Sequence, residues 1–424
     1  MKSKTFFAIL LFFVLTLIEH AHLIAGSGGS AYSRYGVGEV RYFPSDRSVG
    51  KGGATIALLG TNTVSTINPA AWTQLARTRF SLGVTYEGFS SKDGSGSSFL
   101  SGANFNGIVF AVPVSRVNGI VISAGLTPYS MVNYTVVDDV TNANPPYTLT
   151  HTGKGGLSNA HLGISFARGK DWHFGAKLNY LFGTLKHKTS QTFSSADYTT
   201  AELSRETKMN GIGATIGLIY SGAGTLLNLE ESQNLSFGVV FSTGAQLTTT
   251  RENLYQYSAG ATVIGRDTIA AGEGRSFVPF AFGFGISFTS KEQFVLAGDL
   301  YYQNWNKGTI LDVHPTELRD SYRIGVGGEF LPHKELSAEF LQKVAYRFGV
   351  FYHASNLLVA GKGIDEIGVT GGVGLPMFID TRFSVGIEYS IRGTTANNLQ
   401  RDNIIRVTFT LNGGELWFVR PEEE

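Results

Sequence analysis

The chain has no cysteine and little charge. Among its 424 residues no Cys occurs, and only 16% are charged. The lack of Cys excludes disulfide frameworks, thiolate catalysis, cysteine metal sites and a lipoprotein anchor. The formal net charge of +1 gives no argument for nucleic acid or for acidic substrates as partners. Beyond the N-terminus no stretch approaches 18 uninterrupted apolar residues, so the sequence predicts no helical membrane span.

The N-terminus has the composition of a secretory signal. Lys2 and Lys4 precede an apolar run over 6–18, which is too short for a comfortable transmembrane helix. Small residues follow at 25–27. We predict a signal peptide over residues 1–26, with a short membrane anchor as the alternative. A cysteine-free exported protein fits a Gram-negative envelope.

Bulky and small residues alternate along much of the chain. In FVPFAFGFGISF (277–288) every even position from Val278 to Phe288 is large and apolar, and the odd positions from Pro279 to Ser287 are small. Such period-2 segments recur to the end with almost no helical period, which predicts strands. We count about fourteen, over 79–88, 104–112, 119–128, 157–167, 171–183, 208–220, 235–243, 277–289, 293–304, 321–331, 344–353, 365–376, 382–392 and 403–412.

The connections differ in length in a regular way. After odd-numbered segments they are mostly long and polar, over 89–103, 129–156, 184–207, 244–276, 305–320 and 393–402. After even-numbered segments they are mostly shorter, although 221–234 and 332–343 run long. Long loops at one end and tight turns at the other are typical of an outer-membrane barrel. The sequence therefore predicts an all-β, transmembrane antiparallel β-barrel of about 14 strands, with the apolar faces towards lipid and the small ones towards the lumen.

Several charged residues fall on the predicted lumenal face. They are Lys177, Asp299, Arg323, Glu329, Arg347, Glu388 and Arg406. Other strands turn small residues inward, among them Gly211, Gly213, Gly217, Ser236, Gly238, Gly283, Gly285, Gly368 and Gly372. The small residues leave room for a plug, a ligand or water. Because a lone buried charge is costly, the charges indicate either a structural salt network or a direct role in permeation.

Residues 27–78 differ from the rest, being rich in Gly, Ser, Asn and Pro. Within them, RSVGKGGATIAL (47–58) and NPAAW (68–72) resemble the N-terminal hatch of the FadL-type outer-membrane transporter family, in particular its Bacteroidetes members. KVAYRFGVFY (343–352), DEIGVTGGVGLPM (365–377) and FSVGIEYSIRGTT (383–395) resemble its C-terminal strands. The resemblance implies a hatch over 27–78 inside a barrel over 79–424, and passive uptake of hydrophobic or amphipathic, fatty-acid-like molecules.

The resemblance also implies roles for individual residues. Asn68, Pro69 and Ala70 would set the hatch turn, and Gly50, Gly52 and Gly53 would let the hatch pack against the wall. Relatives open sideways at a kinked third strand. Here Gly125 and Pro128 would disturb the ladder of GIVISAGLTPYS, since Pro lacks an N–H; the alternative is that Pro128 simply ends the strand. We find no cluster that would clamp a fatty-acid carboxylate, so the substrate does not carry over.

The sequence gives weaker support to other functions. GKGGA (50–54) lacks the spacing of a phosphate-binding loop, and the histidines lack a metal-ligand spacing. His161, His173 and Ser165 could line a lumen as in an outer-membrane lipase, but Ser and His are common there. We therefore expect no enzyme, no metal and no cofactor, with membrane lipids and a hydrophobic ligand as partners and no nucleic acid. A barrel that docks secreted or surface proteins, and a soluble secreted adhesin, are the alternatives.

Overall fold

The computed structural model describes residues 26–42, 48, 50–195, 197–260, 262–291, 293–333, 338–378 and 381–415. The predicted signal peptide lies outside the described residues, apart from Gly26. Among the residues described, no helix is long and apolar enough to cross a membrane.

Fourteen antiparallel strands form a closed barrel, three of them interrupted once. The third strand is split into β5 and β6, the seventh into β10 and β11, and the eighth into β12 and β13. The barrel elements are β3 (Thr78–Lys92), β4 (Ser97–Ser115), β5 (Ile120–Pro128), β6 (Ser130–Val140), β7 (Tyr147–Arg168), β8 (Trp172–Phe193), β9 (Thr200–Tyr220), β10 (Gln233–Ser242), β11 (Ala245–Ala259), β12 (Thr262–Val278), β13 (Ala281–Ser290), β14 (Phe294–Gln303), β15 (Ser321–Phe330), β16 (Ala345–Val359), β17 (Lys362–Phe378), β18 (Thr381–Gly393) and β19 (Arg401–Glu415). The last strand pairs with the first from Arg401 opposite Lys92 to Glu415 opposite Thr78, which closes the wall. The predicted all-β, 14-stranded antiparallel barrel is confirmed.

Bulky apolar side chains cover the outside of the wall. In β13, Phe282, Phe284 and Ile286 are exposed while Ala281 and Gly285 face inward and are buried. The same alternation leaves exposed large apolar residues on strand after strand around the barrel. An apolar band of this extent would promote aggregation in water and is the expected surface of a barrel in lipid.

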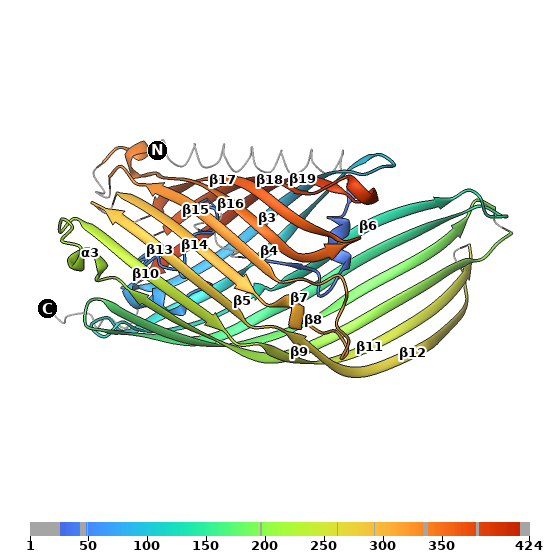
Figure 1. Cartoon of the computed structure of the whole chain (residues 1–424), viewed down its shortest axis with the longest axis horizontal. Coiled ribbons are helices and arrows are strands. Elements are labelled where there is room, and N and C mark those ends of the chain that lie inside the picture. Colours follow the sequence, from blue (N-terminus) through green and yellow to red (C-terminus); the bar gives the residue numbers. More distant parts are fainter. Residues whose placement is uncertain are drawn as a thin grey trace.

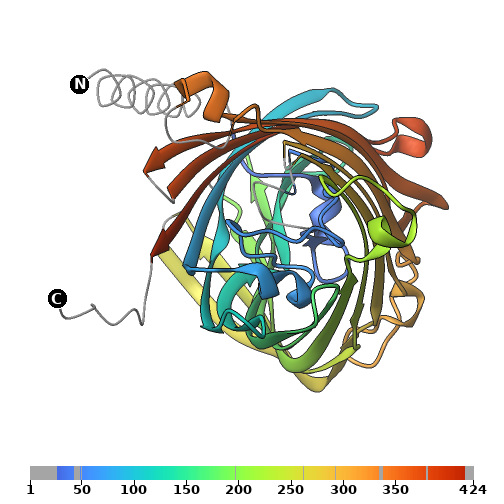
Figure 2. The ribbon, with the colours of Figure 1, turned by 90° about the vertical axis from the view of Figure 1, so that its left-hand side faces the viewer.

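Small residues line the inside because another part of the chain packs there. The described residues of the N-terminal segment (26–42, 48 and 50–77) lie within the barrel (Figure 2). A Cβ at Gly238 would stand 2.5 Å from the Ile56 carbonyl oxygen, and one at Gly327 would stand 2.6 Å from the Lys51 backbone. The small lumenal residues leave room for a plug, a ligand or water. At these positions the protein's own backbone fills that room.

The two ends of the barrel differ. We call the end that holds Thr78 and Glu415 the terminal end, and the opposite one the far end. At the far end, β6, β7, β8, β9, β11 and β12 extend well beyond the other strands (Figure 1). Hairpin connections at this end are short, as between β11, which ends at Ala259, and β12, which begins at Thr262, and between β16, which ends at Val359, and β17, which begins at Lys362.

The prediction of long polar loops at this end is therefore wrong, because most of these segments are strands. Most of 89–103, 129–156, 184–207 and 244–276 continues the flanking strands as paired hairpins, and among the far-end connections of the described residues 304–320 alone is long. The apolar alternation stops where the strands leave the apolar band, because both faces of the sheet then meet polar surroundings. The backbone ladder continues regardless, which residue pattern alone does not reveal.

The remaining elements are short. The N-terminal segment contains β1 (Gly26–Ser27), the 3-10 helix η1 (Ala31–Arg34), β2 (Glu39–Val40) and the 3-10 helix η2 (Pro69–Gln74). The connections contain α3 (Ala223–Leu226), η3 (Trp305–Lys307), η4 (Phe340–Lys343) and η5 (Ala396–Asn398).

The packing of the N-terminal segment on glycine predicts the effect of a larger residue. Gly238→Val should force Ile56 away from β10 and lower the free energy of unfolding by about 1–3 kcal/mol, the usual cost of overpacking. The thermal midpoint in detergent and protease cleavage within 48–77 measure it. Gly272→Val is the matched control, since nothing lies within 4 Å of a Cβ there. Equal behaviour of the two variants would contradict the packing argument.

Candidate functional site

The turn predicted at NPAAW is built around the buried side chain of Asn68. Its Oδ1 accepts a hydrogen bond from the Ala70 N–H (3.0 Å) and so caps η2, while Pro69 occupies the first helical position. Its Nδ2 donates to the Ile56 carbonyl at 2.8 Å, which ties two parts of the N-terminal segment together. A Cβ at Gly217 of β9 would collide with this side chain. The turn is therefore fixed against the wall.

The predicted glycines lie where the N-terminal segment crosses β15, β16 and β17. Gly52 has a φ of +65° and its N–H donates to Thr370 Oγ1 of β17 at 2.9 Å. Gly53 has a φ of +91°, and its N–H donates to the Ser48 carbonyl at 2.7 Å. Gly50 lies against Gly372. Positive φ favours glycine at 52 and 53, and backbone approaches backbone with no side chain between.

Three of the predicted lumenal charges hold the N-terminal segment directly. Lys177 Nζ donates to the Thr66 carbonyl (2.5 Å), and Asp299 Oδ2 accepts from the N–H groups of Thr55 (2.5 Å) and Ile56 (2.8 Å). Glu329 lies 4.0 Å from Lys51 Nζ. Arg347 holds Glu329 from the neighbouring strand at 2.8 Å. Lys177, Asp299 and Glu329 thus anchor the segment, and Arg347 holds Glu329 in place.

Arg406 is the centre of a second, larger network. Its guanidinium donates to Glu87 (3.0 Å), Glu366 (2.8 Å), Glu388 and Glu39 (3.1 Å). Of these, Glu39 belongs to the N-terminal segment and the others to β3, β17 and β18. One guanidinium therefore joins three strands of the wall to the segment, which suits the fixed donor geometry of Arg.

Arg392 and Arg41 extend this network. Arg392 contacts Glu39 at 3.1 Å and Asp402 at 3.2 Å, and Arg41 makes a paired contact with Glu87. Ser30 donates to Asp402 at 2.6 Å. Burial alone would raise the pKa of Glu39, but Arg392, Arg41 and Arg406 together hold that pKa below its ordinary value. The carboxylate is ionised and fixed at neutral pH.

Sequence reasoning placed Glu388 and Arg406 in the lumen but missed several of their partners. Glu87 shares the strand alternation of Thr85, and Glu366 that of Gly368, so their inward direction was available from the pattern. Glu39 and Arg41 lie in the N-terminal segment, which has no sustained alternation. The sequence pattern of such a segment does not predict which wall strand it contacts.

Arg323 lies beside the Arg406 network and interacts electrostatically with Glu366 and Glu388. Its guanidinium is 3.8 Å from the ring centroid of Phe351, and within the described chain it forms no ion pair. It lines a cavity of about 500 Å³ together with His353, Glu39, Arg406 and Phe105. This cavity extends from the charged network to the break between β5 and β6.

The wall is incomplete at that break. β5 pairs with β4 only as far as Leu126 opposite Ile108, and β6 pairs with β7 but not with β4. Pro128 ends β5 at the edge of the gap, whereas Gly125 lies inside the paired part, opposite Val109. The unpaired edges of β4 and β6 thus face each other across a gap in the wall.

The start of the N-terminal segment fills this gap. β1 pairs with β4 in parallel, at Leu100 and Ser101, and β2 pairs with β6 at Ser130 and Met131. Between them, Ser33 Oγ donates to the Asn133 carbonyl at 2.9 Å. Residues 26–41 therefore complete the wall where β4 and β6 do not meet.

The Ser and His residues considered for a lipase are not assembled as a catalytic pair. Ser165 donates to the Gly119 carbonyl at 3.2 Å, and the His161 ring stacks on Trp72 with centroids 6.1 Å apart. His173 lies between Thr73 (2.8 Å) and Ser221 (3.1 Å). In the described part of the chain, no group of three His, Asp or Glu is placed to hold a metal. These residues support η2.

Comparison with solved structures defines the class of protein. A Pseudomonas aeruginosa FadL homologue aligns with a TM-score of 0.59 at 12% identity, over 89% of this chain and 99% of that chain. The Pseudomonas putida toluene transporter TodX gives 0.58 at 13% identity, over 89% and 99%. The Ralstonia pickettii toluene transporter TbuX gives 0.55 at 13% identity, over 87% and 97%. The chain thus has the barrel fold of the FadL-type channels, as the sequence resemblance implies.

A second comparison, with models of protein families, shows the family to which the chain belongs. The model of the BamG family matches residues 2–422, so the chain belongs to the BamG family. No curated protein matches it.

The network around Arg406 makes a quantitative prediction. Arg406→Met removes the cation shared by Glu39, Glu87, Glu366 and Glu388 and leaves them buried together. Breaking such a network by removing one partner typically costs about 3–5 kcal/mol, so the thermal midpoint in detergent should fall sharply. Lys188→Met breaks an exposed pair with Glu202 and should cost less than about 1 kcal/mol. Similar losses in both variants would refute a special role for Arg406.

Proposed function

We propose that the protein is an outer-membrane channel for the passive movement of hydrophobic or amphipathic small molecules, with residues 27–78 as its hatch. The far end faces the outside of the cell and the terminal end the periplasm. No covalent chemistry and no cofactor take part. The Bacteroidetes-like origin and the signal peptide over 1–26 stay predictions from the sequence.

The observation that carries this proposal is the gap between β4 and β6. Residues 26–41 close it, and the cavity of about 500 Å³ lies directly behind, lined by Phe105, Pro128 and Met131 beside the charged network. If these residues move aside, the cavity opens towards the surrounding lipid. An apolar molecule then leaves the lumen sideways and does not cross the polar terminal end.

The closure at the gap is weaker than the rest of the wall. β1 and β2 each contribute two paired residues, whereas β19 and β3 pair along their whole length. Local opening free energies follow the number of contacts that must break, so this is the wall's easiest place to open. The ion pairs of Glu39 and Arg41 oppose that movement and set its cost.

A disulfide lock tests the proposal, because the native chain has no Cys to interfere. Val40 and Ser130 are direct partners in the β2–β6 pairing, and antiparallel partners lie within disulfide range. Val40→Cys with Ser130→Cys should abolish uptake of a fluorescent fatty acid into proteoliposomes, and reduction should restore it. The control pair, Leu296→Cys with Gly328→Cys, joins β14 to β15 within the permanent wall and should leave uptake unchanged. Full uptake through the oxidised gap lock would exclude the lateral route.

The projecting strands favour a second candidate, a platform that docks secreted or surface proteins. β6, β7, β8, β9, β11 and β12 rise far beyond the rest of the barrel (Figure 1), which transport through the gap does not require.

Mass spectrometry of the protein purified from native membrane in mild detergent separates the two functions. A channel should carry a hydrophobic compound enriched over bulk lipid at near-stoichiometric amount. A docking platform should yield extracts that match bulk lipid and retain protein partners in the same preparation.

A further inference from the structure

The cavity of about 500 Å³ behind the gap is lined in part by polar side chains that the protein itself leaves unsatisfied. Arg323 of β15 lies directly opposite His353 of β16, and Asn356 follows on the same strand. None of the guanidinium nitrogens of Arg323 has a hydrogen-bond partner in the described chain, and neither has His353 Nε2 or Asn356 Nδ2. Unsatisfied buried groups of this kind cost free energy. A bound molecule that carries an oxygen acceptor would therefore stabilise this side of the cavity.

Glu388 of β18 lines the same cavity with an unused acceptor. Its side chain is only 8% exposed, its Oε1 accepts from Arg406, and its Oε2 has no partner in the described chain. Arg323 and Glu388 interact electrostatically but lie too far apart for an ion pair. A group placed between them can accept a hydrogen bond from the guanidinium and donate one to the carboxylate. A hydroxyl group does both.

The charges around the cavity disfavour an anionic ligand. Among the described residues, its charged network contains four arginines and five carboxylates, which is an excess of one negative charge. They are Arg41, Arg323, Arg392 and Arg406 with Glu39, Glu87, Glu366, Glu388 and Asp402, which pairs with Arg392. A bound carboxylate would raise this excess to two in a buried site, which is costly. An ammonium group would balance the charge but has no acceptor for Arg323, His353 or Asn356.

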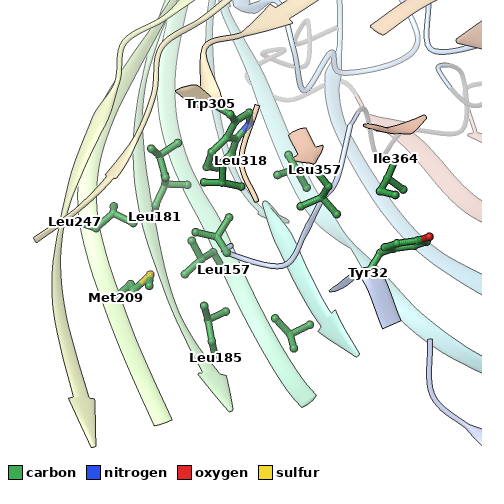
Figure 3. Close-up of a cluster of buried hydrophobic side chains, with 14 of the residues drawn as sticks. Tyr32, Leu157, Leu181, Leu185, Met209, Leu247, Trp305, Leu318, Leu357 and Ile364 are labelled. Atoms are coloured by element: carbon green, nitrogen blue, oxygen red, sulfur yellow. The ribbon is translucent and has the colours of Figure 1, made fainter. Parts of the chain in front are cut away.

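The apolar part of a ligand has its place at the gap. Phe105, Pro128 and Met131 line the same cavity and are not fully buried. Leu157 and Leu357 line it as members of a buried apolar cluster whose side chains pack on one another (Figure 3). The volume of the cavity lies in the range of small-molecule sites. A compact molecule can therefore place its apolar body at the gap and its polar end in the charged part of the cavity.

We propose that the cavity binds a neutral, hydroxyl-bearing molecule with an apolar body, whose hydroxyl group accepts from Arg323 and donates to Glu388. This names a substrate class for the proposed function and rests on that function for the ligand's passage, but not for its binding. The apolar body lies beside Phe105 and Met131, next to the gap. A fatty acid meets the same requirement as the protonated acid, because the ionised carboxylate has no proton to donate. The site thus admits the fatty acid of the disulfide-lock experiment in its neutral form.

Probes that share one apolar body test this on the purified full-length protein in neutral detergent, without measuring transport. They are 1-naphthol, naphthalene, 1-naphthoate and 1-naphthylmethylammonium, compared at neutral pH by isothermal titration calorimetry. 1-Naphthol should bind at least about tenfold more tightly than each of the others, because it alone both donates and accepts a hydrogen bond without adding charge.

Each other result overturns the inference in its own way. Equal binding of naphthalene would show that the polar side chains contribute nothing to recognition. Equal binding of 1-naphthoate would identify an anion site, and equal binding of the ammonium probe would identify a cation site. Absence of binding by every probe would show that water alone satisfies the polar groups of the cavity.

Glu388→Gln tests the charge argument. It leaves four arginines and four carboxylates around the cavity, so 1-naphthoate should gain at least about tenfold in affinity relative to 1-naphthol. A merely structural role of Glu388 would weaken the binding of both probes alike. An unchanged preference between the two probes would contradict the inference.

Arg323→Met locates the hydroxyl group. It removes the unpaired guanidinium and should weaken 1-naphthol binding at least about tenfold. Arg319→Met is the matched control, because Arg319 pairs with Asp365 and does not line the cavity, so this variant should keep its affinity. Thermal midpoints in detergent establish that both variants fold. Equal affinities of the two variants would overturn the inference.

The binding site and the lateral channel fail separately. A preference for 1-naphthol, together with full uptake through the oxidised gap lock, would exclude the lateral route and leave the binding site standing. A lock that blocks uptake, in a protein that shows no preference among the probes, would leave the channel standing and overturn the binding site.

Discussion

The close contact between the N-terminal segment and the glycine-lined wall is the constraint on which the structure depends. Backbone meets backbone at Gly52 and Gly349, at Ile56 and Gly238, and at Pro69 and Gly175. Side chains at these wall positions would hold the segment away from its anchors. Lys177 and Asp299 reach backbone groups of the segment because the intervening wall has no bulk. The small residues and the charged residues of the lumen therefore both hold the segment against the wall.

The same N-terminal segment also closes the gap between β4 and β6. A barrel with an unpaired edge would expose backbone hydrogen-bonding groups to lipid, which is costly. Residues 26–41 satisfy part of both edges, and Glu39 and Arg41 tie this part of the chain to Arg406 and Glu87. The protein thus closes its wall with a piece that is not a wall strand. This closure consists of two short pairings, whereas the β19–β3 ladder is continuous.

The strand order and the facing of the wall could be predicted from the sequence because lipid outside and a packed lumen inside impose a strict period of two. FVPFAFGFGISF (277–288) shows this directly, and Lys177 and Asp299 were placed on the lumenal side by the same rule. The prediction failed where the two faces of a strand no longer meet lipid on one side and a packed lumen on the other. Most of 244–276 forms paired strands in which large and small residues no longer alternate, and nothing in their composition separates them from a loop. Glu39 and Arg41 could not be assigned, since their partners are set by how the segment crosses the lumen.

The path of the N-terminal segment constrains the order in which the protein can form. Ser30 is bonded to Asp402, 372 residues away, and Tyr42 to Ser321, 279 residues away. Contacts between such distant parts of a chain form slowly. The N-terminal segment therefore reaches these contacts only when the last strands of the wall are in place. The residues that close the gap between β4 and β6 are thus also residues that the finished wall has to enclose.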